Sequence, residues 1–66
     1  MLPLAAVERI ARKAGIKRIS AKAIKELEGI TNQIGLELAL EAAQVARYAK
    51  RKTILKKDIH LVAGKD

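Results

Sequence analysis

One stretch of this chain, from Ala21 to Ala49, constrains the fold more than any other. It runs for 29 residues without proline, and apolar side chains recur along it at three- and four-residue intervals. This periodicity is typical of an α-helix with one buried face. One helix of that length would extend about 43 Å at about 1.5 Å per residue, which is more than a small globule is wide. The sequence therefore predicts a long helix whose apolar face needs a partner chain to cover it.

Two glycines lie inside this predicted helix, Gly29 and Gly35. Each is less favourable in a helix than alanine by about 1 kcal/mol, so an interior glycine needs a packing reason. Gly35 lies at the midpoint, where an antiparallel partner helix would cross most closely. The pattern offers no such reason for Gly29.

The composition also leaves association as a source of stability. The chain has 66 residues, no cysteine and a single histidine, His60, so it lacks the residues for a disulfide or an imidazole metal cluster. We expect His60 to lie on the surface, because no nucleophile, second base or phosphate-binding glycine loop accompanies it. The sequence predicts no enzyme activity, cofactor, metal or small-molecule substrate.

Positive charge gathers at both ends of the predicted long helix. The net charge is +7; residues 8–25 hold seven basic and one acidic side chain, residues 26–46 hold four glutamates and no lysine or arginine, and residues 47–57 hold six basic side chains. Two such clusters favour nucleic acid over a merely solvated surface. Tyr48 is the sole aromatic residue, so single strands would find few stacking platforms, and double-stranded DNA held by its phosphates is favoured.

Membrane association is the weaker alternative for a basic chain. No apolar run approaches the roughly 18 residues that span a bilayer, and the polar face of the long helix is acidic where surface-seeking helices are basic. The N-terminal residues lack the basic region of a signal peptide. These features and the lack of cysteine favour a soluble intracellular protein.

Shorter elements flank the long helix. A short amphipathic helix from Leu4 to Ala14 ends at Gly15, Ser20 is a good N-cap for the long helix, and a last helix from Lys56 to Ala63 ends at Gly64. Extended segments around Ile19 and Ile54 join them, without a linker or an apparent repeat. The expected organisation is a single all-α domain, residues 1–66, of short helix, long helix and short helix.

Crossing two long helices at Gly35 would bring the two basic clusters together. The first loop of one chain (Lys17, Arg18) would then lie beside the second loop of its mate (residues 50–52), and Ile19 and Ile54 would pair between the chains. The basic face of the N-terminal helix would supply a third site midway between them. Lys22 and Lys25 either pair with nearby glutamates along the helix or meet an anion.

Several segments resemble the archaeal histones, members of the histone-fold family, from one end of the chain to the other. They are Leu2-Pro3-Leu4-Ala5, Arg9-Ile10, Ala14-Gly15, Lys17-Arg18-Ile19-Ser20, Ala42, Ala46-Arg47, Arg51-Lys52-Thr53-Ile54 and Asp58-Ile59. The resemblance implies a histone fold, an obligate handshake dimer with itself or a paralogous histone, and compaction of duplex DNA on the chromosome in the cytoplasm. The alternative is a histone-fold pairing subunit of a transcription or chromosome-scaffold complex.

The resemblance also implies roles for particular positions. Arg18 is expected in the minor groove, oriented by Thr53 of the partner chain, with Arg9 at the central site. The full expected DNA-binding set is Arg9, Arg12, Lys13, Lys17, Arg18, Ser20, Lys50, Lys52 and Thr53. Arg51 and Asp58 are expected to form an internal ion pair.

Contacts between chains follow from the same resemblance. The expected dimer core contains Leu27, Ile34, Gly35 and Leu38. Contacts between dimers are expected at Val45, Tyr48, Asp58 and Leu61, with Tyr48 in place of the histidine common in relatives, which leaves assembly beyond the dimer open. Gly15 matches a small residue that lets neighbouring dimers stack. Leu36 and Leu40, where relatives are often polar, either widen the dimer core, which we favour, or form an extra contact ridge.

Overall fold

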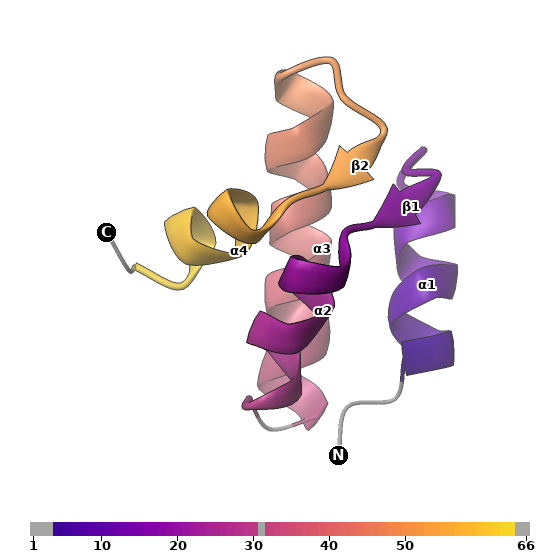
Figure 1. Ribbon diagram of the computed structural model, residues 1–66. Helices are drawn as coiled ribbons and strands as arrows, with labels where there is room; N and C mark the ends of the chain where they lie inside the picture. Colours follow the sequence, from indigo (N-terminus) through magenta and orange to yellow (C-terminus); the bar gives the residue numbers. More distant parts are fainter. Residues whose placement is uncertain (1–3, 31, 65–66) are drawn as a thin grey trace.

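The computed structural model describes residues 4–30 and 32–64. These residues form four helices and two short strands, arranged as in Figure 1. In chain order they are α1 (Leu4–Lys13), β1 (Arg18–Ile19), α2 (Ala21–Glu28), α3 (Asn32–Tyr48), β2 (Thr53–Ile54) and α4 (Lys56–Val62). The prediction of helices linked by short extended segments is confirmed.

The prediction of one continuous helix from Ala21 to Ala49 is wrong. Helix α2 ends at Glu28 and α3 begins at Asn32, so the chain doubles back and α3 runs behind α2 in Figure 1. Gly29 is the C-cap of α2, and the N–H of Ile30 donates to the carbonyl of Leu27 at 3.0 Å. Because glycine is a poor helix former, the break falls where helix continuation is weakest.

Folding back also removes the need for a partner that helix length had suggested. The molecule measures 29 × 27 × 18 Å, so a continuous helix of about 43 Å would project beyond it. In the folded-back chain the apolar faces of α2 and α3 enter one shared core. That core contains Val7, Ala11, Ile16, Ala23, Leu27, Ala39, Ala42, Ala43, Ala46, Ile54 and Ile59.

The chain consists of two halves with the same layout, α1–β1–α2 and α3–β2–α4. Strands β1 and β2 are parallel, with Arg18 opposite Thr53 and Ile19 opposite Ile54. Helix α1 packs on α3, and α2 packs on α4. The predicted pairing of Ile19 with Ile54 is therefore present, but it joins the halves of one chain rather than two chains.

The sequence of the two halves repeats as well, contrary to the expectation of no repeat. Identical residues stand at the spacing of Arg18 and Thr53, the pair that sets the strand register. They include Arg12 and Arg47, Lys17 and Lys52, Ile19 and Ile54, Lys22 and Lys57, Ile24 and Ile59, and Gly29 and Gly64. The repeat is diluted by unlike residues, and the strand register makes it visible.

The first helix of each half ends in the same manner. After α1, Gly15 has a φ of +86° and the N–H of Ile16 donates to the carbonyl of Ala11 at 2.9 Å; after α3, Lys50 has a φ of +58° and the N–H of Arg51 donates to the carbonyl of Ala46 at 2.8 Å. A left-handed residue followed by this backward hydrogen bond is the Schellman arrangement. The predicted stops at Gly15 and Gly64 are confirmed, and Pro3 lies outside the described residues.

Candidate nucleic-acid interface

The parallel strand pair brings two basic segments of the chain side by side. The N–H groups of Lys17 and Arg18 donate to the carbonyl of Lys52 at 2.8 and 3.2 Å, and the N–H of Ser20 donates to the carbonyl of Ile54 at 2.9 Å. Lys17, Arg18, Lys50 and Lys52 are exposed, and Thr53 is half-buried. Backbone hydrogen bonds thus hold a cluster of exposed cations, which we call the loop-pair cluster: Lys17, Arg18, Lys50 and Lys52.

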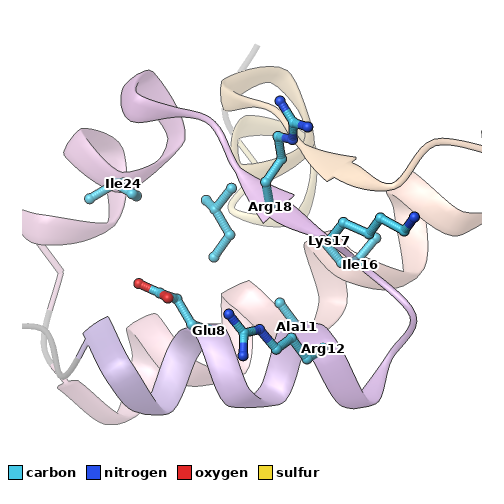
Figure 2. Close-up of a pocket in the computed structure, with 8 residues that line it drawn as sticks. Glu8, Ala11, Arg12, Ile16, Lys17, Arg18 and Ile24 are labelled. Atoms are coloured by element: carbon cyan, nitrogen blue, oxygen red, sulfur yellow. The ribbon is translucent and has the colours of Figure 1, made fainter.

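A hollow beside this cluster connects it to α1. It has a volume of about 210 Å³; Ala11, Ile16, Ile19 and Ile24 supply its apolar lining, and Glu8, Arg12, Lys17 and Arg18 its polar lining. Figure 2 shows Arg12 and Glu8 rising from α1 on one side and Arg18 extending away from α1 on the other. Arg12 therefore adds a cation from the helix to those of the loops.

The other predicted basic residues of α1, Arg9 and Lys13, are exposed as well. Lys13 lines a second hollow, between α1 and α3, together with Ile10, Ala14, Leu40, Gln44 and Arg47. Arg47 is the repeat equivalent of Arg12 and was given no role from the sequence. The matching position of two arginines in the two halves was the signal that could have found it.

Arg51 and Asp58 form the predicted ion pair. Arg51 Nη2 lies 2.7 Å from Asp58 Oδ1, and Arg51 Nη1 donates to Asp58 Oδ2 at 2.9 Å and to the carbonyl of Thr53 at 3.0 Å. This two-pronged geometry is the arrangement that arginine and carboxylate groups favour. It connects the loop after α3 to β2 and α4, so it fixes the loop that carries Lys50 and Lys52.

Asp58 also caps α4. Its Oδ2 accepts from the N–H of Leu55, the N-cap residue, at 2.8 Å. Burial by itself would raise the pKa of this carboxyl, but the hydrogen bonds from Arg51 and Leu55 outweigh burial and lower it. The same hydrogen bond to Asp58 raises the pKa of Arg51. Both groups are therefore held in their charged forms.

Ser20 has a structural role besides the expected contact with DNA. Its hydroxyl accepts from the N–H of Ala23 at 3.0 Å, as the predicted N-cap of the helix that begins at Ala21. An accepting hydroxyl still has its own proton to donate. Ser20 lines a further hollow with Lys22, Leu55, Lys56, Lys57 and His60. The lysines of this hollow follow the two N-cap residues, and sequence reasoning gave Lys56 and Lys57 no role.

His60 is not the surface residue that the sequence predicts. It is half-buried on α4, and its Nε2 lies 3.0 Å from Glu26 Oε2 on α2. Among the described residues Nε2 has no hydrogen-bond partner of acceptable geometry, so the contact is a close approach of two ionisable groups rather than a directed hydrogen bond. His60 thus contributes to the contact between the two halves.

The residues expected at contacts between chains fall into two groups. Leu27 and Gly35 are buried and Leu38 is half-buried inside this one chain, whereas Ile34 is 51% exposed. Tyr48 is 89% and Leu61 65% exposed; Gly15 is exposed too, and Val45 is half-buried.

Asp58 corrects part of the expected contact between dimers. It is 1% exposed and bonded to Arg51, which conflicts with its expected availability to a neighbouring dimer. The ion pair that fixes the second loop covers the carboxylate that the resemblance had also placed at the surface.

Two searches of the described residues bear on other kinds of site. No helix in residues 4–30 and 32–64 is long and apolar enough to cross a membrane. The same residues contain no group of three or more histidine, cysteine, aspartate or glutamate side chains placed to hold a metal ion.

Comparison with known proteins gives one family. A family model described as histone-like transcription factor (CBF/NF-Y) and archaeal histone matches residues 1–62. The HAN1 archaeal histone of Thermococcus zilligii is 38% identical over 60 residues, which cover 91% of this chain and 90% of that protein. Probable archaeal histone 3 of Methanocaldococcus jannaschii is 40% identical over 58 residues, 88% of this chain and 87% of that protein. No solved structure matches significantly.

These matches confirm the resemblance and the histone fold that it implied, and the family is one of structural proteins rather than enzymes. They span nearly the whole chain, including the loop-pair cluster and the Arg51–Asp58 ion pair. The chain belongs to the family of histone-like transcription factors (CBF/NF-Y) and archaeal histones.

Proposed function

We propose that this protein binds double-stranded DNA without sequence preference and bends and compacts it on the chromosome, in the cytoplasm. The observation that carries the proposal is the register of β1 and β2, which places Lys17 and Arg18 beside Lys52. Fixed, exposed cations suit a phosphate backbone, and an arginine held near a narrow minor groove responds to its negative potential. The archaeal histones among its relatives support this assignment.

The contact residues follow from this placement. Lys17, Lys50, Lys52 and Thr53 would contact phosphates around Arg18, and Ser20 would donate its hydroxyl proton. Arg9, Arg12 and Lys13 would continue the surface along α1. Backbone contacts of this kind position the protein on a duplex and carry no base information.

Bending needs more than one such site. We propose that the protein acts on DNA as a dimer, with a second copy or a paralogous histone, so that two loop-pair clusters and the α1 cations grip one duplex. Leu27, Ile34, Gly35 and Leu38 are the proposed core of that dimer. The exposed Tyr48 and Leu61, with Val45, are proposed contacts between dimers, and Gly15 a stacking position.

Electrophoretic mobility shift on random-sequence duplex DNA tests the proposal. We expect binding at moderate salt, with the logarithm of the affinity falling linearly with the logarithm of the salt concentration. The double variant Arg18→Ala/Lys52→Ala should weaken binding on all sequences alike and reduce the salt slope by about 2, since each phosphate contact contributes about 0.9. Lys25→Ala, which removes an exposed cation of α2 outside the cluster, is the matched control and should change the slope little.

The same experiment separates the second candidate function. The family description also names histone-like transcription factors, so a pairing subunit of a transcription or chromosome-scaffold complex is the alternative. Such a subunit need not bind DNA alone, and absence of binding by the pure protein would contradict our proposal. Altered base preference in the double variant would contradict backbone recognition.

Nuclease digestion of the complexes tests the assembly. Protected lengths that increase in discrete steps would show dimers added one after another, whereas one fixed length would show a closed particle.

A further inference from the structure

Every contact between the two halves of this chain is one that a second copy could supply. The halves meet through β1 on β2, α1 on α3, α2 on α4 and α2 on α3, and after Glu28 a short connection joins them. If that connection straightened, α1–β1–α2 of one chain could dock on α3–β2–α4 of another with the same interfaces. This is the geometry of an exchange of identical elements between protomers.

The connection is built so that straightening has little steric resistance. Gly29 is exposed, its φ is −83°, and a Cβ placed on it would meet no atom within 4 Å. Neither its backbone conformation nor its surroundings require glycine in the closed chain. Its effect is instead to weaken a continuous helix through α2 and α3, because glycine is disfavoured in helix interiors.

One apolar side chain close to the connection is left uncovered by the closed chain. Ile34, in the first turn of α3, is 51% exposed. In an exchanged pair, the twofold axis that relates the chains would pass near the straightened connections, and the two long helices would meet there. Ile34 would gain cover that the closed chain cannot give it, which favours association through burial of apolar surface.

We propose that this protein folds as a closed monomer and dimerises by exchanging its α1–β1–α2 halves, with Gly29 setting the balance between the two forms. The closed form satisfies the inter-half contacts within one chain. The exchanged form makes the same contacts between two chains and adds helix continuity and cover for Ile34, against the entropy of association. The dimer is then concentration-dependent rather than obligatory, and this holds whether or not the protein binds DNA.

Introduced cysteines report the two forms directly, since the chain has none of its own. Arg18 and Thr53 are register partners, and neighbouring strands lie about 4.8 Å apart, within the range that a disulfide bridges. In Arg18→Cys/Thr53→Cys, oxidation would join the closed form within one chain and the exchanged form between two. Non-reducing electrophoresis separates these products, Lys17→Cys/Lys52→Cys is an independent second pair, and the single-cysteine variants measure random crosslinking.

We expect both products in the parent background, with the dimeric product increasing over about three decades of protein concentration. Gly29→Ala should lower the dimer dissociation constant roughly 10- to 30-fold in sedimentation equilibrium, because alanine favours each of two continuous helices. Gln44→Ala, at an exposed position of α3 far from the connection, is the matched control and should change that constant little. Inserting Gly-Gly-Ser between Gly29 and Ile30 should increase the monomeric product.

Two results would overturn the proposal. Crosslinked dimers alone at every concentration, even with the insertion, would show that no closed monomer forms. Intrachain products alone, even in Gly29→Ala at the highest concentration, would show that the halves do not exchange. Neither readout uses DNA, so a failure here is distinct from a failure of the proposed DNA binding.

Discussion

The two halves of the molecule, α1–β1–α2 and α3–β2–α4, repeat one layout but stabilise it by different interactions. In the first half the turn after α1 contains Gly15, the next residue is the buried Ile16, and Ser20 caps α2 with its side chain. In the second half Lys50 takes the place of the glycine and Arg51 the place of Ile16. There the cap of α4 is provided by Asp58, three residues into the turn.

The difference separates what the layout requires from what the loop cations require. Ile16 and Ala23 are buried apolar residues, and their equivalents, Arg51 and Asp58, form an ion pair. Both solutions direct a strand into a helix. The polar solution leaves Lys50 in a left-handed conformation that glycine would adopt without strain. The second half thus accepts local strain while presenting one more cation than its glycine-bearing counterpart.

Removing Asp58 should give the largest effect, because it breaks the interaction that distinguishes the second half. Asp58→Ala leaves Arg51 and the Leu55 N–H without their acceptor, and we expect a loss of about 2 kcal/mol in the free energy of unfolding. The double variant Arg51→Ile/Asp58→Ala copies the residues of the first half and should recover much of that loss. Urea denaturation measures both. A double variant no more stable than Asp58→Ala would show that the two halves are not interchangeable at these positions.

Exchanging the turn residues should have the next largest effect, with opposite signs in the two halves. Gly15→Ala places a Cβ at a φ of +86° and should reduce stability by roughly 1 to 2 kcal/mol. Lys50→Gly relieves the same kind of strain and should increase stability by about 0.5 to 1 kcal/mol, after the entropy cost of glycine. No atom lies within 4 Å of a Cβ on Gly15, so its loss would report backbone strain alone. Thermal unfolding that moves in the same direction for both variants would contradict the equivalence of the turns.

Acid should weaken the second half more than the first. The pKa of Asp58 lies below its ordinary value of 3.8 in the folded protein, so the unfolded chain binds its proton more readily. The stabilisation is complete above the ordinary pKa and is lost as the pH falls through the lowered one. Urea midpoints measured from about pH 7 to about pH 2 should therefore fall more steeply for the parent protein than for Asp58→Asn. Parallel curves would refute this role of the carboxylate.

Much of this layout can be predicted from local sequence. Apolar periodicity identifies α1 and α4, while Gly15, Ser20 and Gly64 mark helix ends because their backbone or side chain suits a cap. The Arg51–Asp58 pair and the loop cations followed from a family resemblance spread along the chain.

The path of the chain between the halves could not be predicted in the same way. Residues 24–49 have helical periodicity on both sides of Gly29, and periodicity does not distinguish a continuous helix from two helices that fold back. The break depends on a small energy difference at Gly29, set against contacts between residues distant in the sequence. The partner of His60 depends on the same long-range packing, because Glu26 meets it only when α2 lies on α4. Arg47 was missed because its equivalence to Arg12 becomes visible only through the strand register.

That equivalence gives the smallest expected effect. If both halves contribute matching cations to DNA binding, Arg12→Ala and Arg47→Ala should each weaken binding to random duplex DNA a few-fold and each reduce the salt slope by about 1, the loss of one phosphate contact. Fluorescence anisotropy over a range of salt concentrations measures both quantities, with Lys25→Ala as the control for loss of one charge. A reduced slope for Arg12→Ala alone would show that the halves share a fold but not an interface, and that the strain at Lys50 serves the second loop by itself. Equal reductions would show that the repeat extends from the backbone to the DNA-binding surface, because each arginine follows the same turn of its helix into its strand.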